Sequence, residues 1–121
     1  MKILVADDDL DQLTLRCLLL EHSGFETVQA SDPKTALAVA KSEKPTCAVL
    51  DLRFPTEESG LRLVRDLKAL DSAMHLLLLT GSNPARVRNR SEAGLIDEVL
   101  EKGSACASLV RKLKQIEAHR A

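Results

Sequence analysis

Aromatic side chains are almost absent from this sequence. Phe25 and Phe54 are its only phenylalanines, and it has neither tryptophan nor tyrosine. Proteins that bind single-stranded nucleic acid stack bases on aromatic faces, so the composition argues against that class of function. The net charge of −1 provides no overall electrostatic attraction to nucleic acid or to a membrane surface. No apolar run approaches the roughly 20 residues that a membrane-spanning helix needs.

Cysteine is also scarce. Cys17, Cys47 and Cys106 are the only three, and their spacing fits no metal-binding or redox motif. Each lies in an apolar stretch, so we expect buried, reduced thiols, which are typical of the cytosol. The apolar run near the N-terminus is too short for a signal peptide and ends in acidic residues. These features predict a soluble cytoplasmic protein.

With so few aromatic residues, the hydrophobic core must be built from aliphatic side chains. Hydrophobic residues make up 45% of the 121 residues, and this length is typical of one domain, spanning 1–121. Short apolar runs alternate with amphipathic helical stretches. The expected strands are 2–6, 26–30, 47–50, 75–79 and 98–101. Helices are expected around 13–20, from Pro33, after a polar loop at 53–60, from Pro84, and from Ser104 onward.

This alternation predicts the fold class. Strands that are apolar on both faces and separated by helices form a parallel sheet covered by helices on each side. Right-handed crossovers then make the protein a doubly wound α/β domain. Ligands of such sheets bind beyond the carboxyl ends of the strands. The residues that end each apolar run are therefore the candidates for function.

Acidic residues gather at these strand ends. Asp7, Asp8 and Asp9 follow the first strand, and Asp51 follows the third. Two carboxylates about 4 Å apart repel each other by roughly 4 kcal/mol at an effective dielectric constant near 20. A fold that brings them together requires a cation, and oxygen ligands of this kind suit Mg²⁺. Asp9 also fits the N-cap of the first helix, which is the favoured interpretation for that residue.

Two further side chains complete a chemical set. Thr80 ends the fourth apolar run and supplies a hydroxyl, and Lys102 follows the fifth strand and supplies a positive charge. A carboxylate nucleophile such as Asp51, a metal, a cation and a hydrogen-bond donor are the parts that phosphoryl transfer needs. Since a carboxylate is already ionised at neutral pH, no general base is required.

Four segments, in order and with matching separations, resemble the receiver domain of two-component response regulators: ILVADDD, VLDLRFP, LLLTGS and LEKG. The resemblance covers the whole chain. It implies a flavodoxin-like (βα)5 fold whose doubly wound, five-stranded parallel sheet has the strand order 2-1-3-4-5. It also implies that the domain takes a phosphoryl group from a histidine kinase or phosphotransfer protein onto an aspartate, without being an enzyme in the usual sense.

The resemblance assigns roles by position. Asp51 is the expected phosphoacceptor, and Thr80 and Lys102 are expected to bind the phosphoryl oxygens. Mg²⁺ is expected at Asp8 directly, at Asp7 through water, and at Asp51 and the backbone carbonyl of Arg53. Each role is assigned to the residue of this chain that occupies the matching position in the family's motif.

Two positions that bear on the output of the domain depart from the family's pattern. Val99 stands where the family usually has an aromatic switch residue, and Gly103 stands where it usually has a proline. Because no DNA-binding segment follows the last helix, we expect output through protein–protein contact, as in a stand-alone receiver of the chemotaxis-regulator type. A domain of a longer regulator or hybrid kinase remains the alternative. Similar domains also dimerise through their fourth and fifth helices.

Three functions follow as hypotheses. The first is a phosphoacceptor signalling domain with Asp51 as acceptor. The second is a receiver-like interaction module that is independent of phosphorylation, motivated by Val99 and Gly103. The third is an independent metal-dependent phosphatase or phosphotransferase, disfavoured because Arg53 stands where a second acid would follow the nucleophile. In the fourth helix, Arg86, Arg88 and Arg90 are consistent with a solvated face or with a partner surface.

Overall fold

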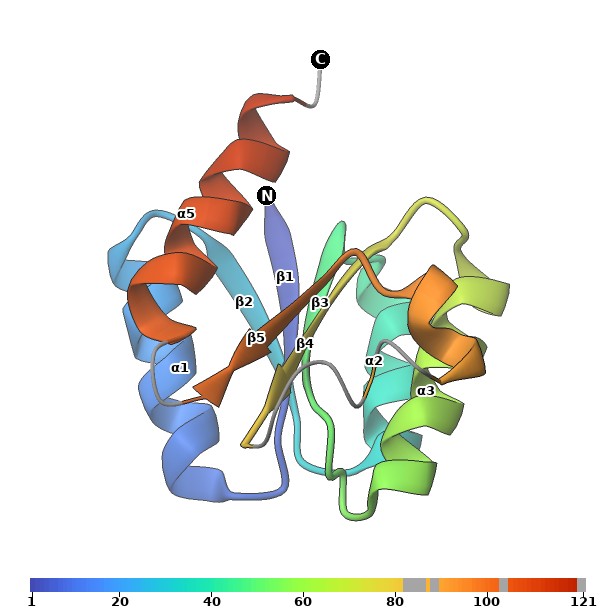
Figure 1. The fold of residues 1–121 in the computed structure, drawn as a ribbon. Helices are drawn as coiled ribbons and strands as arrows, with labels where there is room; N and C mark the ends of the chain where they lie inside the picture. The colour runs from blue at the N-terminus through green and yellow to red at the C-terminus, as the bar shows by residue number, and fades with distance from the viewer. Residues whose placement is uncertain (82–86, 88–89, 103–104, 120–121) are drawn as a thin grey trace.

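A computed structural model describes residues 1–81, 87, 90–102 and 105–119 (Figure 1). Strands and helices alternate along the chain as expected. The strands are β1 (Lys2–Ala6), β2 (Glu26–Ala30), β3 (Cys47–Asp51), β4 (His75–Thr80) and β5 (Glu98–Glu101). The helices are α1 (Leu10–His22), α2 (Pro33–Glu43), α3 (Glu57–Leu70), the 3-10 helix η1 (Ser91–Leu95) and α5 (Ala105–Ala118).

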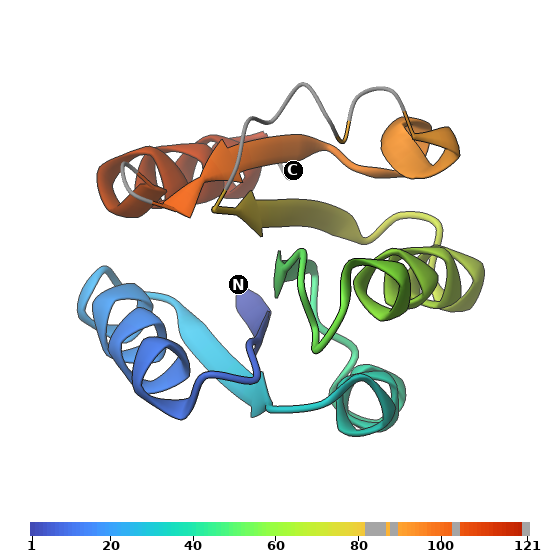
Figure 2. The ribbon, with the colours of Figure 1, turned by 60° about the horizontal axis from the view of Figure 1, so that its bottom comes forward.

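The five strands form one parallel sheet in the order β2-β1-β3-β4-β5, which confirms the predicted fold class and strand order. Their register aligns the carboxyl ends. Ala6 pairs with Leu50, Asp51 pairs with Leu79, and Thr80 pairs with Glu101. The residues that follow or end β1, β3, β4 and β5 therefore meet at one edge, which Figure 2 turns toward the viewer.

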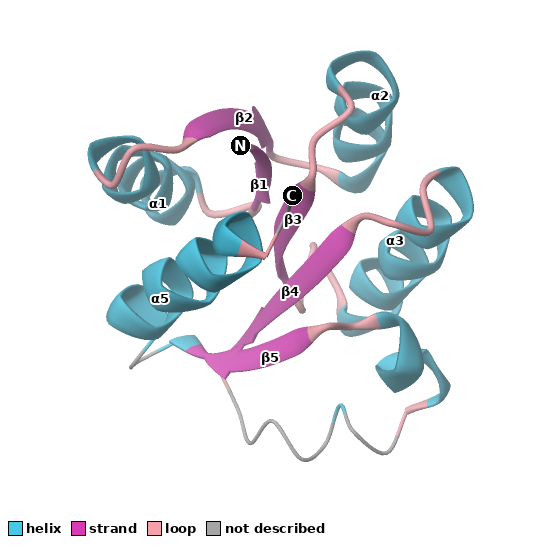
Figure 3. Ribbon diagram, turned by 90° about the horizontal axis from the view of Figure 1, so that it is seen from above, coloured by secondary structure: helices cyan, strands magenta, loops and turns pink. Residues whose placement is uncertain are grey.

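Helices cover both faces of the sheet (Figure 3), and each face has its own core. The core beneath α2 and α3 includes Leu50, Phe54 and Leu67. The core beneath α1 and α5 includes Phe25 and Leu77. Both cores are mainly aliphatic, as the composition predicts. Cys17 and Cys47 are buried and unbridged, as expected, whereas the side chain of Cys106 lies outside the described residues.

Local signals in the sequence set the starts of two helices. Asp9 caps α1 by accepting hydrogen bonds from the backbone N–H groups of Asp11 and Gln12, so the N-cap interpretation of Asp9 is confirmed. Asp32 caps α2 by accepting from the N–H of Thr35, with Pro33 in the first turn. These caps fix where the chain turns after β1 and β2.

The start of α3 differs from the prediction. The loop expected to run to Gly60 ends at Thr56, because Thr56 and Ser59 form a capping box in which each side chain accepts the other's backbone N–H. Gly60 lies inside the helix and not in the loop. A methyl group there would overlap the backbone carbonyl of Leu52, so glycine serves the close approach of α3 to the end of β3.

The predicted fourth helix falls largely outside the described residues, as do Arg86 and Arg88. Val87 is buried in the core beneath α2 and α3. Arg90 donates a hydrogen bond to Glu58 at 2.7 Å, and its guanidinium lies 3.6 Å from Glu57. Arg90 thus binds the first turn of α3. Among the described helices, none is long and apolar enough to cross a membrane.

Candidate functional site

Three carboxylates from two strand ends converge at the carboxyl edge of the sheet. One oxygen from each of Asp7, Asp8 and Asp51 lies within 4.8 Å of the others. Asp7 is fully buried and Asp51 is 6% exposed, whereas Asp8 is exposed. Asp8 and Asp51 line a cleft of about 510 Å³. The convergence expected from the sequence is therefore present, although Asp51 is the last residue of β3 and does not follow it.

Lys102 links the end of β5 to this cluster. Its ammonium group donates a hydrogen bond to Asp51 Oδ2 at 3.0 Å and lies 3.8 Å from Asp7 Oδ2. The side chain is 31% exposed, so part of it remains open to the cleft. A fixed positive charge between two buried carboxylates offsets their repulsion, and it faces the position where an anionic group on Asp51 would lie.

Thr80 and the segment after Asp51 form the rest of the cleft wall. Thr80, the last residue of β4, is almost fully buried. Both Thr80 and Arg53 line the cleft. The backbone N–H of Arg53 donates to Asp51 Oδ1 at 3.3 Å, and the N–H of Leu52 donates to the carbonyl of Leu79 at 2.8 Å. The second bond holds Leu52, at the start of the loop, against β4, and the first bond holds the carboxylate of Asp51. The chain that follows Asp51 and the side chain of Asp51 are therefore both fixed.

The pKa values of the two buried carboxyl groups, Asp51 and Asp7, are shifted in opposite directions. Burial raises the pKa of Asp51 above its ordinary value of 3.8, and the Asp7 charge acts in the same direction, while Lys102 opposes both. Burial would also raise the pKa of Asp7, but the backbone N–H of Asp9, together with Arg16 and Lys102, holds that pKa below its ordinary value. Asp7 is therefore the more strongly stabilised anion of the pair.

Arg16 is a site residue that the sequence analysis missed. Its guanidinium Nη1 donates to Asp7 Oδ2 at 2.9 Å, and its side chain is only 10% exposed. Helical side chains lean toward the N-terminus of their helix, so an arginine in α1 can reach back to the end of β1. Its position three residues after the buried Leu13, on the edge of the buried stripe, is the signal that could have identified it.

The donor set fits a magnesium ion. Oxygen atoms of Asp7, Asp8 and Asp51 are close enough to share one cation, and hard divalent cations prefer such ligands. Soft ligands are not part of this group, because the described cysteines Cys17 and Cys47 are buried in the core on the α1 side of the sheet. Mg²⁺ suits this set of ligands better than zinc does.

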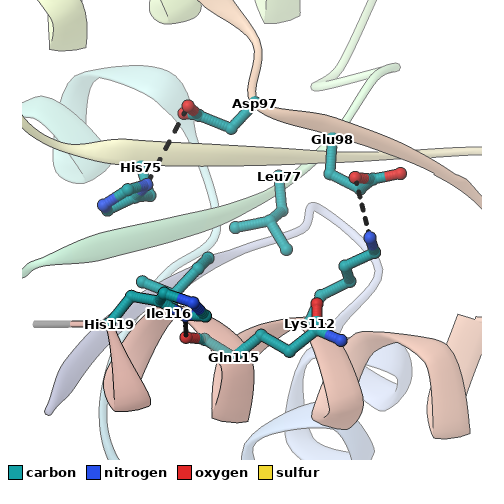
Figure 4. Close-up of a pocket in the computed structure, with 8 residues that line it drawn as sticks. All are labelled: His75, Leu77, Asp97, Glu98, Lys112, Gln115, Ile116 and His119. Atoms are coloured by element: carbon teal, nitrogen blue, oxygen red, sulfur yellow. Dashed lines mark hydrogen bonds and ion pairs between the residues drawn. The ribbon is translucent and has the colours of Figure 1, made fainter.

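A second hollow, of about 350 Å³, lies between α5 and the amino ends of β4 and β5 (Figure 4). His75 and His119 both line it, although the sequence separates them widely. Its two carboxylates already have partners: Asp97 lies 3.6 Å from Lys68 and accepts the backbone N–H of Leu76, and Glu98 lies 3.5 Å from Lys112. Because this hollow is at the opposite end of the strands from Asp51, it takes no part in the chemistry of the cleft.

Comparison with known proteins gives a consistent result. A family model described as the response regulator receiver domain matches residues 3–114. The alkaline phosphatase synthesis transcriptional regulatory protein PhoP of Bacillus subtilis is 37% identical over 82 residues, covering 68% of this chain and 34% of that protein. The transcriptional regulatory protein PrrA of Mycobacterium bovis is 31% identical over 115 residues, covering 95% of this chain and 49% of that protein. The chain thus spans between a third and a half of the length of these relatives.

A solved structure adds a chemical observation. The response regulator protein TrrA from Thermotoga maritima, determined in complex with Mg²⁺ and BeF, has a TM-score of 0.83 and 25% sequence identity. The match covers 94% of this chain and 96% of that one. The fold similarity therefore extends over nearly the whole of both chains.

Proposed function

This chain belongs to the family of response regulator receiver domains of two-component systems, and on that premise we propose that Asp51 accepts a phosphoryl group from a histidine kinase or phosphotransfer protein. The observation that carries the proposal is the 3.0 Å contact between Lys102 and Asp51 in a cleft that also gathers Asp7 and Asp8. A lone carboxylate at a strand end would not need this surrounding set of charges.

The transfer itself needs little from the protein beyond position and charge. An oxygen of Asp51 forms a bond to phosphorus as the phosphorus–nitrogen bond of the donor's phosphohistidine breaks, and the released imidazole takes a proton from solvent. Lys102 and Thr80 donate to the phosphoryl oxygens as charge builds on them. Both residues line the cleft beside Asp51, which supports these roles.

The metal belongs to the same proposal. Asp7, Asp8, Asp51 and the backbone carbonyl of Arg53 would hold Mg²⁺, which supplies positive charge to neutralise the phosphoryl oxygens. The relative TrrA, with its Mg²⁺ and BeF, supports this assignment by similarity.

The proposal extends to the biological setting. We take residues 1–121 as one receiver domain that acts in the cytoplasm and signals through a protein–protein surface, without itself contacting DNA. The domain is not a turnover enzyme: it takes up and loses its own phosphoryl group. Dimerisation through the fourth helix and α5 belongs to the same proposal, although most of the fourth helix is outside the described residues.

One observation favours an alternative output. Val99, in β5, is only partly buried and packs against the core beneath α2 and α3. Valine has no ring that could swing between a buried and an exposed position. This supports a second candidate function, an interaction module that does not switch with phosphorylation. Gly103, the other motivation, lies outside the described residues.

A small phosphodonor tests the proposal directly. The protein is incubated with Mg²⁺ and acetyl phosphate, and its intact mass is measured. We expect the mass of one added phosphoryl group, lost in Asp51→Asn and retained in Asp66→Asn, an exposed carboxylate on α3. Absence of an adduct in the wild-type protein, or its persistence in Asp51→Asn, contradicts the acceptor role.

Amide chemical shifts separate the candidates further. Beryllofluoride with Mg²⁺ should shift amides around Asp51 in every case. Shifts that extend to Val99 and η1 support a phosphorylation-dependent output, whereas shifts confined to the cleft support the interaction module. Continuous hydrolysis of an added phosphomonoester, abolished by Asp51→Asn, would instead identify a phosphatase.

A further inference from the structure

Arg16 contacts the one carboxylate of the cluster that is sealed from solvent. Asp7 has no exposed surface, and Arg16 Nη1 donates to its Oδ2 at 2.9 Å. The other oxygen, Oδ1, accepts the backbone N–H of Asp9 at 3.0 Å. Both oxygens of Asp7 are therefore already bound by donors from the chain itself. A cation that binds Asp7, directly or through a bound water, must share these oxygens or displace a donor.

Lys102 and Arg16, the two positively charged side chains of the site, differ in position and in exposure to solvent. Lys102 lies between Asp51 and Asp7, at 3.0 Å from one and 3.8 Å from the other, and it is partly exposed to the cleft. Arg16 has its short contact with Asp7, is 90% buried, and comes from α1. A buried carboxylate is costly unless a charged partner compensates it. Arg16 supplies that compensation where solvent cannot.

A divalent cation and Arg16 compete for the same negative charge. The oxygens of Asp7, Asp8 and Asp51 that could hold such an ion lie within 4.8 Å of one another, so the ion would lie close to the guanidinium bonded to Asp7. Two positive charges that bind one carboxylate repel each other, and burial of Asp7 and Arg16 limits the screening of that repulsion by solvent. The guanidinium that stabilises Asp7 without metal must therefore weaken the binding of the metal.

We propose that Arg16 acts as an internal competitor of Mg²⁺, occupying Asp7 in the metal-free protein and setting the Mg²⁺ concentration at which the acceptor site fills. This proposal rests on the proposed function and deepens it, since it assigns a regulatory residue to the same site. Arg16 is a positioning residue: it contacts neither the acceptor Asp51 nor the cleft-facing Asp8 in the described contacts, and it acts through Asp7.

The proposal predicts two effects of opposite sign. Replacing Arg16 with an uncharged side chain should destabilise the metal-free protein, because Asp7 loses its buried partner. The same replacement should strengthen Mg²⁺ binding. If Arg16 had a purely structural role, its replacement would lower both the stability of the metal-free protein and its affinity for Mg²⁺, because a disordered Asp7 would weaken the fold and the metal site together.

The experiment compares three variants with the wild-type protein. Arg16→Met keeps an unbranched apolar side chain in place of the aliphatic part of arginine and removes the charge, and Arg16→Lys keeps the charge on a single ammonium group. Arg111→Met removes an exposed arginine from α5 and is the control for net charge. Mg²⁺ binding is measured by isothermal titration calorimetry in chelator-treated buffer, and thermal unfolding is followed by circular dichroism with and without Mg²⁺.

We expect Arg16→Met to bind Mg²⁺ at least tenfold more tightly than the wild type, with Arg16→Lys in between and Arg111→Met unchanged. Without metal, Arg16→Met should unfold at a lower temperature, and saturating Mg²⁺ should remove most of that difference. If Arg16→Met is unfolded without metal, refolding on Mg²⁺ addition supports the proposal and gives the affinity. Failure to refold at any Mg²⁺ concentration counts against it.

For an Arg16→Met protein that is folded without metal, equal or weaker Mg²⁺ binding overturns the proposal. If the wild type still binds Mg²⁺ and forms the Asp51 adduct in that case, only the competitor role of Arg16 fails. If neither protein binds Mg²⁺ and the wild type forms no adduct, the acceptor function fails as well. The two failures are thus distinguished by the behaviour of the wild-type protein alone.

Discussion

Gly60 gives a test in which helix propensity and packing predict opposite results. Alanine is better than glycine in a helix interior by about 1 kcal/mol, so propensity alone predicts that Gly60→Ala stabilises α3. In the structure, however, the added methyl group overlaps the carbonyl oxygen of Leu52 and meets its carbonyl carbon at 3.0 Å. Backbone atoms cannot rotate away as a flexible side chain can, so α3 or the end of β3 must shift.

The magnitude follows from the two opposing effects. Overpacking typically costs 1–3 kcal/mol, and contact with backbone favours the upper part of that range. After the gain in propensity, we expect Gly60→Ala to lower the free energy of unfolding by about 1–2 kcal/mol. For a urea dependence of roughly 2 kcal/mol per molar, the midpoint falls by about 0.5–1 M. Urea titration followed by far-ultraviolet circular dichroism measures this change.

Gly94→Ala is the matched control. Among the residues that the structure describes, none other than its chain neighbours lies within 4 Å of a methyl group at Gly94, so its substitution should change stability by no more than about 0.5 kcal/mol. Because Leu52 directly follows Asp51, Gly60→Ala should also slow adduct formation at Asp51. A Gly60→Ala protein as stable as the wild type, or more so, would refute the close approach of α3 to β3.

Three further predictions concern caps and charges. Asp32→Ala should lower the thermal midpoint at neutral pH; because hydrogen bonds from the Thr35 N–H and hydroxyl hold the pKa of Asp32 below its ordinary 3.8, the difference from wild type should shrink as pH falls below that value. Arg65→Met should cost about 1–3 kcal/mol, since it leaves the buried Glu92 carboxylate without its 2.6 Å partner, and adding Glu92→Gln should recover part of the loss in urea titrations. Lys102→Met should slow adduct formation from acetyl phosphate by on the order of 100-fold, and an unchanged rate would contradict its proposed role.

The sheet could be predicted from the sequence because its strands are short, continuous apolar runs that end in polar residues. Such runs have few alternatives once helical stretches separate them. Asp7, Asp51, Thr80 and Lys102 were found for the same reason: they mark the ends of those runs. Even so, β3 and β4 extend one residue further than expected, to Asp51 and Thr80, since backbone pairing continues after the apolar run stops.

The errors arose where tertiary contacts decide the outcome. The sequence predicts a polar loop that ends at Gly60, but the packing of this glycine against Leu52 inside α3 cannot be deduced from neighbouring residues. The sequence alone does not single out Arg16, because a charged residue in an amphipathic helix is usually solvated. Its contact with Asp7 depends on how α1 lies over the end of β1, which is a property of the assembled fold.

The separation of the phenylalanines between the two cores has a practical consequence. Phe54 is fully buried beneath α2 and α3, three residues after Asp51, and Phe25 is buried on the opposite face, where Lys114 lies 4.7 Å from its ring centre. Biosynthetic replacement of phenylalanine by a fluorinated analogue would give two fluorine resonances, one for each layer of the protein. Titration with a phosphoryl analogue would then report, in one spectrum, whether a change at the cleft crosses the sheet or stays on the side where it begins.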